Sequence, residues 1–510
     1  MTDATLDAAS MRVLATWCER RQAGAEDIEV AEACLDVTAA WPRSIRVQAL
    51  AKWVRRGVGQ ADQDVGFSAT GRRVRVDSPR AVIRVPEGAP VPVQVTATTR
   101  RRGCWDTPWP IAQRLVDQAL ACGMPHSAHD ASCGLGTLLL ALAERGVRQL
   151  SGSDTDPVAV TIARRLLPEA HISLQCGLEP GPQAQLVIGN PPFVSPERQG
   201  QTRASLRRRF PWLEGRFDLC VPMLWQATDR VLPGGVLAQI FPSAVLNERY
   251  GRPLRQRWLA SDRVVSVTPV RDFKGVAIPL TMVVMRRGEG PAQLPGGAHA
   301  TSLMRLARVP MDGRLTDDVL ALASKIRACS VPMSELARVD TGVVAHGGGM
   351  NKSARLHDCP GEGRVPFADA RDAFQGRRQW LDYHGQDLHR PKDLDLFAPP
   401  KLVVQRIRGR GPVRVYVDTS DLVLGHTCTV VKPMCHAPSP ERLKELLTSD
   451  LIAGWLTIFC GEGLDLYPAD VAAVPVPRMW VEGHGGSLCD AWGLSASEAS
   501  LLRALGIQKS

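Results

Sequence analysis

The spacing of apolar and polar positions first predicts helices at the N-terminus. Apolar residues recur at helical spacing over 11–21, 27–38 and 45–58, and Trp41-Pro42 breaks the pattern between the last two. Between 80 and 99 the pattern changes to two short strands around a Pro-Gly turn. We therefore expect residues 1–98 to form a helical region with short strands.

From about residue 99, short apolar runs alternate with helical stretches. The runs end near Asp130, Asp154, Cys176 and Asn190, and further runs cover 236–242, 264–270 and 281–286. This alternation predicts an α/β domain with a mostly parallel sheet, helices on both faces, and ligands at the carboxyl ends of the strands. The last two runs should form a hairpin that contributes an antiparallel strand. Pro233-Gly234-Gly235 is expected to be the turn before the fifth strand.

Beyond the alternating domain, short strands and turns dominate. The stretch 288–297 is rich in Gly and Pro and indicates a linker. We expect the catalytic domain to cover 99–290, a linker region 291–335, and a mixed α+β domain 336–510. Its predicted strands lie at 339–344, 401–407, 413–418 and 427–431.

The most informative segment is 185–193, an apolar run that stops at Asn190-Pro191-Pro192-Phe193. The two prolines can neither continue a central strand nor start a helix there. Asn190 Oδ1 and the Pro191 carbonyl can accept both hydrogens of an amino group on a flat ring, and Phe193 can stack on that ring. Such a grip pulls the nitrogen toward a tetrahedral shape and frees its lone pair. The alternative is an ordinary turn.

A glycine-rich segment lies upstream, between a predicted strand and a predicted helix. It contains Asp130, Ala131, Cys133, Gly134 and Gly136, and its small residues let the backbone approach a ligand closely. The next strand ends at Asp154, where a ribose bound over the first loop would place its hydroxyls. The alternative for Asp154 is a helix N-cap, although Pro157 suggests that the helix begins after Asp156.

Composition and charge favour a polyanionic partner. The formal net charge is +10, the pI is about 9.1, and most basic residues are arginine, which grips phosphate bidentately. The 13 cysteines include no C-x-x-C pair, which argues against a disulfide scaffold. A metal site could be imagined at His426, Cys428, Cys435 and His436, but strand and loop positions explain these residues better, so we expect no metal. No signal peptide or membrane span is evident, and we expect a cytoplasmic protein.

The order of these motifs resembles a known family. Thr107-Pro108, the segment from Asp130 to Gly136, Asp154 and Asn190-Pro-Pro-Phe193 follow one another as in the S-adenosylmethionine-dependent N6-adenine DNA methyltransferases of restriction–modification systems. The similar subgroup has its cofactor region first and its target recognition C-terminal. The resemblance covers about 100–290 well and the C-terminal part more loosely.

The resemblance implies the class I, Rossmann-like fold with a seven-stranded sheet, and methyl transfer from S-adenosyl-L-methionine to N6 of a flipped adenine in double-stranded DNA. A separate restriction endonuclease or defence-complex subunits would be partners. It also implies that Thr107 and Pro108 contact the methionine end of the cofactor, that Asn190 to Phe193 hold the adenine, and that Phe273 lies on the base's other side.

Two positions depart from the family's pattern. Ala131 stands where the family often has proline. The family's acidic residue after the third strand, which binds the cofactor's adenine amine, has no obvious counterpart, and Gln175 or a backbone group is the candidate substitute.

Two arginine groups are candidate DNA contacts. Arg203, Arg207, Arg208 and Arg209 lie in a basic segment, 195–216, that we expect to be a loop on the DNA backbone; the alternative is a solvated loop. In the C-terminal domain the candidates are Arg406, Arg408 and Arg410, with a solvated strand edge as the alternative.

Two other functions remain open from the sequence. Asn-Pro-Pro-aromatic segments also serve methyltransferases of release-factor glutamine and of ribosomal RNA guanine N2, although those chains are usually shorter. The chain could instead be a non-catalytic DNA-binding subunit of a defence complex.

Overall fold

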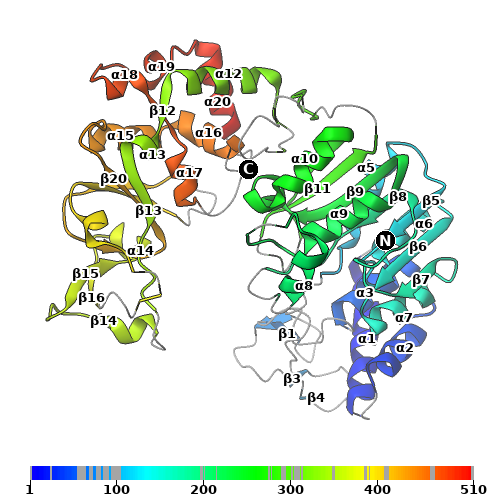
Figure 1. The fold of residues 1–510 in the computed structure, drawn as a ribbon. Helices are drawn as coiled ribbons and strands as arrows, with labels where there is room; N and C mark the ends of the chain where they lie inside the picture. Colours follow the sequence, from blue (N-terminus) through cyan, green and yellow to red (C-terminus); the bar gives the residue numbers. More distant parts are fainter. Residues whose placement is uncertain are drawn as a thin grey trace. The chain divides into compact units, whose positions relative to one another are not determined.

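The computed structural model divides into two units, residues 1–313 and 314–510, which are described separately (Figure 1). The residues that the structure describes are 3–22, 26–53, 65–67, 73–75, 82–83, 91–92, 105–195, 199, 202–213, 215–273, 276, 278–288, 294–299, 303, 311, 314–346, 351–383, 388–389, 391–406, 413–459 and 466–506.

Three helices open the first unit: α1 (Asp3–Gln22), α2 (Asp27–Val37) and α3 (Arg43–Trp53). The predicted helices are thus confirmed, except that 54–58 of the third lie outside the described residues, and the chain turns at Trp41-Pro42 as expected. Helix α1 packs against α2 and α3, while α2 contacts α7 (Pro157–Leu166) and α3 contacts α6 (Thr137–Glu144). The N-terminal helices therefore form an outer layer over α6 and α7.

Two pairs of short strands follow. Strand β1 (Val65–Phe67) pairs with β2 (Arg73–Arg75), and β3 (Val82–Ile83) pairs with β4 (Val91–Pro92), both antiparallel. The second pair confirms the two strands predicted between 80 and 99.

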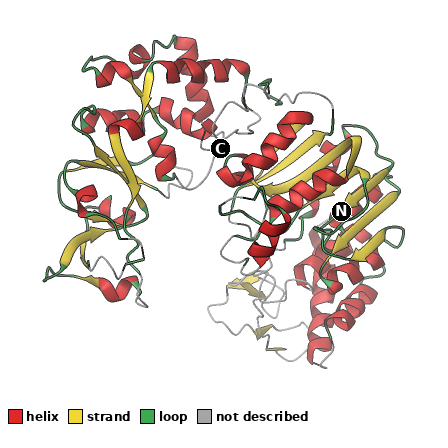
Figure 2. Ribbon diagram, viewed as in Figure 1, coloured by secondary structure: helices red, strands yellow, loops and turns green. Residues whose placement is uncertain are grey.

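A seven-stranded sheet in the order β10-β11-β9-β8-β5-β6-β7 organises the first unit (Figures 1 and 2). Its strands are β5 (Ser127–Asp130), β6 (Gln149–Asp154), β7 (His171–Leu174), β8 (Ala184–Gly189), β9 (Val231–Pro242), β10 (Arg263–Val270) and β11 (Leu280–Arg286). Strands β5 to β9 pair in parallel, and β11 is antiparallel to both neighbours. This is the strand order of class I methyltransferases, so the predicted fold class is confirmed.

Helices cover both faces of this sheet (Figure 2). They are α5 (Trp109–Leu120), α6, α7, α9 (Cys220–Arg230) and α10 (Arg252–Ser261). Helix α8 (Thr202–Arg209) lies between β8 and α9 in the chain, and short 3-10 turns η2 (Ser243–Leu246) and η3 (Arg249–Gly251) precede α10. The first strand, β5, lies between β6 and β8, so the chain order reverses there. The crevice at the carboxyl ends of β5 and β8 is where a sheet of this kind places a ligand.

Two local predictions are wrong. Pro233-Gly234-Gly235 lies inside β9, because a register shift opposite Ala184 and Leu186 absorbs the irregular residues. The basic segment 195–216 is not a loop throughout, since 202–209 form helix α8. Ala, Leu and Arg are strong helix formers, and this propensity carries more weight there than the charge.

The second unit contains two four-stranded sheets, β13-β20-β17-β18 and β14-β16-β15-β19. Its strands are β12 (Ser330–Pro332), β13 (Ala337–Thr341), β14 (Leu356–His357), β15 (Arg364–Ala368), β16 (Gln379–Asp382), β17 (Lys401–Gln405), β18 (Val415–Asp418), β19 (Val423–Leu424), β20 (Cys428–Pro433) and β21 (Pro475–Pro477). Its helices are α12 (Asp317–Ala328), α13 (Met333–Leu336), η4 (Lys352–Arg355), α14 (Ala370–Ala373), η5 (Leu394–Phe397), α15 (Pro440–Thr448), α16 (Asp450–Phe459), α17 (Pro468–Ala472), α18 (Arg478–Val481), α19 (Leu488–Ala491) and α20 (Ala496–Gly506).

This unit begins earlier than the predicted boundary at 336. Helix α12 and strand β12 lie in the stretch expected to be a linker, and β12 pairs with β21 near the other end of the unit. A buried ion pair, Lys401 Nζ to Asp418 Oδ2 at 2.7 Å, joins the neighbouring strands β17 and β18. Within the described ranges of both units, no helix is long and apolar enough to cross a membrane.

Candidate active site

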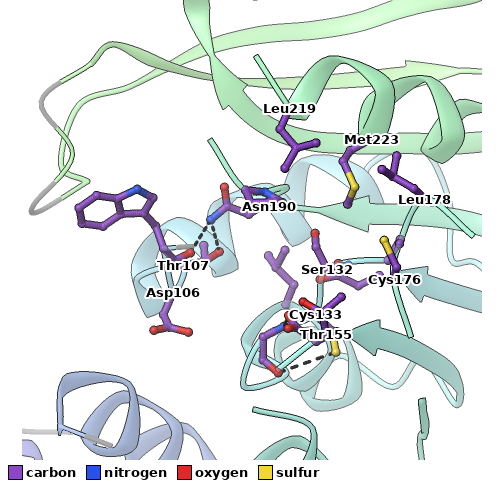
Figure 3. Close-up of a pocket in the computed structure, with 18 of the residues that line it drawn as sticks. Asp106, Thr107, Ser132, Cys133, Thr155, Cys176, Leu178, Asn190, Leu219 and Met223 are labelled. Carbon is purple, nitrogen blue, oxygen red and sulfur yellow. Dashed lines mark hydrogen bonds between the residues drawn. The ribbon is translucent and has the colours of Figure 1, made fainter. Parts of the chain in front are cut away.

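A cavity of about 320 Å³ lies at the carboxyl ends of β5, β6, β7 and β8 (Figure 3). Of the residues predicted for the site, the structure places eight on its wall: Thr107, Asp130, Ala131, Cys133, Gly134, Asp154, Asn190 and Pro192. Pro108, Gly136, Pro191, Phe193 and Phe273 do not line it. The side chains of Phe193 and Phe273 are buried, so their stacking on a base stays a prediction.

Asn190 directly follows β8, and two hydrogen bonds fix its amide. Its Nδ2 donates to the Trp105 carbonyl at 2.9 Å and to Thr107 Oγ1 at 3.1 Å (Figure 3). Its Oδ1 is buried and has no hydrogen-bond partner among the described residues. A buried amide oxygen without a partner is costly, so this atom is suited to accept a hydrogen from a ligand in the cavity.

The glycine-rich loop after β5 forms the opposite wall. Gly134 and Gly136 have φ values of +55° and +82°, a backbone region that favours glycine. At Gly136 a Cβ would also lie 2.9 Å from Leu167 Cδ1. Both glycines are therefore required by the backbone, which brings the loop close to whatever fills the cavity.

The carboxyl group of Asp130 is fully buried at the end of β5. Burial raises its pKa to about 7, and the charge of Asp154 acts in the same direction, while hydrogen bonds from Ser132 partly offset both. The backbone N–H of Ser132 donates to Asp130 Oδ1 at 3.0 Å. Asp130 is thus poised to change its charge near neutral pH.

Asp154 links the first loop to the second. Its Oδ2 accepts from the Gly134 N–H at 2.9 Å, and its Oδ1 accepts from the Asp156 N–H at 2.9 Å. The N-cap of α7 is Asp156, whose side chain accepts from Val158 N and Ala159 N. Asp154 is therefore not the helix cap, and the alternative considered from the sequence is excluded.

The turn after β7 forms a third part of the wall, through Cys176, Gly177 and Leu178. No acidic residue among them occupies this position, as the sequence indicated. Gln175 is not the substitute in this structure, since it does not line the cavity and its Nε2 donates to the Pro180 carbonyl at 2.8 Å.

Two arginines hold this turn from outside the cavity. Arg230, which is buried, donates to the Gly177 carbonyl at 2.8 Å and to the Glu179 carbonyl at 2.5 Å. Arg209 donates to the Leu178 carbonyl and to Glu179 Oε1. Three consecutive carbonyls are therefore fixed by two guanidinium groups.

The other predicted arginines have varied surroundings. Arg203 and Arg207 both donate to the Gly215 carbonyl, at 2.9 and 2.5 Å, while Arg208 is exposed. Arg406 donates to the His426 carbonyl and lies 4.9 Å from the Tyr467 ring centroid, which gives it a structural role in its own unit. Arg408 and Arg410 lie outside the described residues.

The imagined metal cluster is not assembled. Cys428 is buried in β20, and His436 Nε2 lies 3.1 Å from the Glu335 carbonyl. In the part of the chain that the structure describes, no group of three or more His, Cys, Asp or Glu side chains could hold a metal ion.

Several wall residues were missed from the sequence: Trp105, Asp106, Ser132, Thr137, Leu138, Thr155, Cys176, Gly177, Leu178, Val194, Gln199, Leu219 and Met223. Trp105 and Asp106 adjoin Thr107-Pro108 and could have been included by proximity. Gln199, Leu219 and Met223 belong to no motif, and only the fold brings them to the cavity.

Comparisons with known proteins agree with this geometry. Residues 183–274, which contain the Asn-Pro-Pro segment, match the Eco57I restriction-modification methylase family. The chain is 30% identical over 266 residues to the Type II methyltransferase M.PaeR7I of Pseudomonas aeruginosa, covering 47% of this chain and 43% of that protein. It is 27% identical over 198 residues to the Type II methyltransferase M.BanIII of Aneurinibacillus aneurinilyticus, and this match covers 32% of this chain and 34% of that protein. The chain thus spans less than half the length of these curated relatives.

Solved structures are similar at low TM-scores. The type IIG restriction endonuclease BpuSI has a TM-score of 0.38 and 13% identity, and the alignment covers 98% of this chain and 77% of the BpuSI chain. A type I restriction-modification methyltransferase subunit from Streptococcus thermophilus has a TM-score of 0.33 and 16% identity, and the alignment covers 51% of this chain and 54% of that subunit. The fold assignment rests on the strand order instead. By its family match and its relatives, the chain is similar to restriction–modification methyltransferases, which confirms the resemblance seen in the sequence.

Proposed function

We propose that this protein is a site-specific DNA methyltransferase that transfers a methyl group from S-adenosylmethionine to N6 of a flipped adenine. The observation that supports it best is the buried Asn190 Oδ1, which lacks a partner while both hydrogens of its amide are held by Trp105 and Thr107. An oxygen fixed in this way accepts hydrogens and cannot donate them, so it suits an amino group.

The cavity wall fits the cofactor. The loop with Gly134 and Gly136 allows close backbone approach, and Asp154 would accept from the ribose hydroxyls. Asp130 would face the positive charge of the sulfonium, and the turn at 176–178 would border the adenine. When bound, the cofactor supplies a methyl group that is activated by the sulfonium.

Asn190 would act on the amine through hydrogen bonding alone. An exocyclic amine on a purine is a weak nucleophile because its lone pair is delocalised into the ring. A hydrogen bond to Asn190 Oδ1 polarises the N–H bond and draws the nitrogen toward a tetrahedral shape, which turns the lone pair toward the methyl donor. The amide is neutral and takes no proton itself, so the proton that the methylated nitrogen loses would pass to solvent, and the demethylated cofactor would leave as S-adenosylhomocysteine.

An adenine within a duplex cannot reach Asn190, so the base must leave the helix at a cost of a few kcal/mol. We assign the compensating contacts to the second unit, and to the exposed basic side of α8, where Arg208 lies. A restriction endonuclease or other defence subunits would be the partners of such an enzyme.

The test is long-read sequencing of DNA from cells that express the chain alone, since it reports the modified base and its context together. We expect N6-methyladenine within one short motif, and its loss with Asn190→Ala. Removal of one transition-state hydrogen bond should lower the rate about a hundredfold or more, while calorimetry should show nearly unchanged cofactor affinity. Near-normal turnover of Asn190→Ala would refute the assignment, and methylated cytosine would correct the target.

A further inference from the structure

Thr107 and Asn190 are hydrogen-bonded neighbours on the cavity wall, although they lie 83 positions apart in the chain. Asn190 Nδ2 donates to Thr107 Oγ1 at 3.1 Å and to the Trp105 carbonyl at 2.9 Å (Figure 3). The Trp105 carbonyl belongs to the backbone, so any residue at that position would supply it. Among the described residues, Thr107 is therefore the only side chain that holds the Asn190 amide.

The Thr107 hydroxyl is itself held in a fixed position. The residue is buried, and a β-branched side chain has few rotamers. Pro108 follows directly, restricts the backbone of Thr107 to an extended shape, and is the N-cap of α5. Helix α5 packs against β9 and β11 of the sheet. The hydroxyl is thus anchored to the same sheet whose strand β8 leads into Asn190.

Loss of this hydroxyl would release the Asn190 amide from its present direction. One N–H of Asn190 Nδ2 would be left buried without an acceptor, which is unfavourable. Rotation of the side chain toward another acceptor would relieve this cost, and Oδ1 would move with it. A group that stabilises a transition state is effective only at the right place and in the right direction, so the rate would fall even if the substrate still binds.

Contact with the cofactor is the alternative role for Thr107, since the resemblance in the sequence places Thr107 and Pro108 at the methionine end. Pro108 does not line the cavity, whereas Thr107 does. The two roles change different quantities. A cofactor contact changes the dissociation constant for S-adenosylmethionine, and support of Asn190 changes the rate of the chemical step.

We propose that Thr107 is a positioning residue for methyl transfer, because its hydroxyl accepts from Asn190 Nδ2 and so fixes the direction in which Asn190 presents Oδ1 to the target amine. This inference rests on the proposed function, since Asn190 has its role only there. It assigns Thr107 to the chemical step and not to cofactor affinity.

The experiment compares Thr107→Val, which replaces the hydroxyl by a methyl group of similar size, with Thr107→Ser, which keeps a hydroxyl. Thr228→Val is the matched control, since buried Thr228 Oγ1 also accepts from a side-chain N–H, Trp258 Nε1 at 2.9 Å, but does not line the cavity. For each full-length variant, kcat is measured with saturating S-adenosylmethionine and a saturating duplex that carries the motif found by sequencing. Calorimetry gives the dissociation constant for S-adenosylmethionine.

We expect kcat of Thr107→Val to fall about tenfold or more, while its dissociation constant for S-adenosylmethionine changes less than about twofold. Thr107→Ser should keep most of the wild-type kcat. Thr228→Val should keep all of it, although this variant also loses a buried hydrogen bond. If Thr107→Val does not fold, Thr107→Ala takes its place.

The other outcomes contradict the proposal. A normal kcat of folded Thr107→Val would overturn it, and so would a dissociation constant for S-adenosylmethionine that rises as much as kcat falls, since Thr107 would then act through the cofactor. An equal loss of kcat in Thr107→Ser or in Thr228→Val would mean that packing, and not this hydroxyl, is responsible. Failure of the proposed function is seen separately, because the wild type would then methylate no adenine, and this inference would fail with it.

Discussion

At the end of β5, two neighbouring side chains have opposite protonation preferences. Burial, reinforced by Arg230, lowers the pKa of His129 to about 4, so this imidazole is neutral at pH 7. Its Nδ1 lies 2.9 Å from Ser151 Oγ. Burial raises the pKa of Asp130 to about 7. The contribution of His129 to folding stability is present above its unfolded pKa of 6.5 and is lost as the pH falls toward 4. The contribution of Asp130 is present at low pH and is lost as the pH rises toward 7.

Asp130 makes cofactor affinity depend on pH. A cationic ligand favours the charged carboxylate, so binding of S-adenosylmethionine should release a proton from Asp130 below about pH 7. We expect its dissociation constant to fall as pH rises from about 6 to about 7 and to level off above. S-adenosylhomocysteine lacks the sulfonium charge and should show a shallower dependence.

Calorimetry with S-adenosylmethionine and with S-adenosylhomocysteine, over the pH range from about 6 to above 7, measures how the two dissociation constants differ in their pH dependence. Asp130→Asn is the control, since an amide cannot titrate, and the two ligands should then show parallel pH profiles. Identical slopes for both ligands in the wild type would mean that Asp130 does not sense the sulfonium.

Single residues were predictable where chemistry and position coincide. Asp130 and Asp154 end strands and Asn190 directly follows one. Because the carboxyl ends of parallel strands meet at one edge of the sheet, their convergence could be expected. Gln199 and Met223 could not be found in this way, because they reach the cavity through a loop and a helix whose paths depend on tertiary packing. The aromatic rings of Phe193 and Phe273 were expected at a base, and the structure buries both.

At the scale of elements, α8 and the turn after β7 are joined by one side chain. Arg209, the last residue of α8, donates to Leu178 and Glu179, and Leu178 lines the cavity. Buried Arg230 of α9 holds the carbonyls on either side. The turn at 176–178 is thus held in position by side chains of two neighbouring helices.

Loss of Arg209 should therefore loosen the adenine end of the cofactor site. We expect Arg209→Met to raise the dissociation constant for S-adenosylmethionine severalfold, because the Leu178 carbonyl would lose its charged donor, while Arg230 keeps the turn from unfolding. Charge-assisted hydrogen bonds of this kind contribute about 1–3 kcal/mol when desolvated, and less for the partly exposed Arg209.

Arg208→Met is the matched control, one position earlier on the same helix and exposed. Both variants lose one positive charge, so any general electrostatic effect on binding is shared. Equal cofactor affinities of the two variants would show that the Arg209 contacts do not shape the site.

The elements of the sheet were largely predictable, since apolar runs alternating with helices leave few arrangements. The predicted antiparallel hairpin at 264–286 is confirmed by the pairing of β10 with β11. Helix α8 was missed because its arginines suggested a solvated loop, although its residues are good helix formers. The path of β9 through Pro233-Gly235 was missed because a β-bulge is a property of the strand pair and leaves little trace in one strand.

At the scale of the whole molecule, we expect the two units to have different functions, cofactor binding in one and DNA recognition in the other. All described wall residues of the cavity lie between 105 and 223, within the first unit. The net charge of +10 over the chain suits a polyanion. We therefore expect cofactor binding to belong to the first unit and selection of a DNA sequence to require the second.

A chain truncated after Gly313 tests this division. If it is soluble and folded, it should bind S-adenosylmethionine like the full chain, but its kcat/KM on the motif should fall at least about a hundredfold, because specific DNA binding exceeds nonspecific binding by several orders of magnitude. Full-length Asn190→Ala serves as the inactive reference. Methylation of the same motif at a similar rate by the truncated chain would assign recognition to the first unit.

The anchoring of Asn190 reaches across the chain, since Trp105 lies 85 positions before it. An amide turned by 180° exchanges its oxygen and its nitrogen, and the two orientations have nearly the same shape. The Trp105 carbonyl can only accept a hydrogen bond, so it favours the orientation that presents the Asn190 oxygen to the cavity, and Thr107 Oγ1 accepts the second amide hydrogen in that orientation. A base with a carbonyl group in place of the amine would then meet two lone pairs facing each other. In the proposed function, discrimination between amino and keto bases would therefore depend on a segment far from the Asn-Pro-Pro motif as well as on the motif itself.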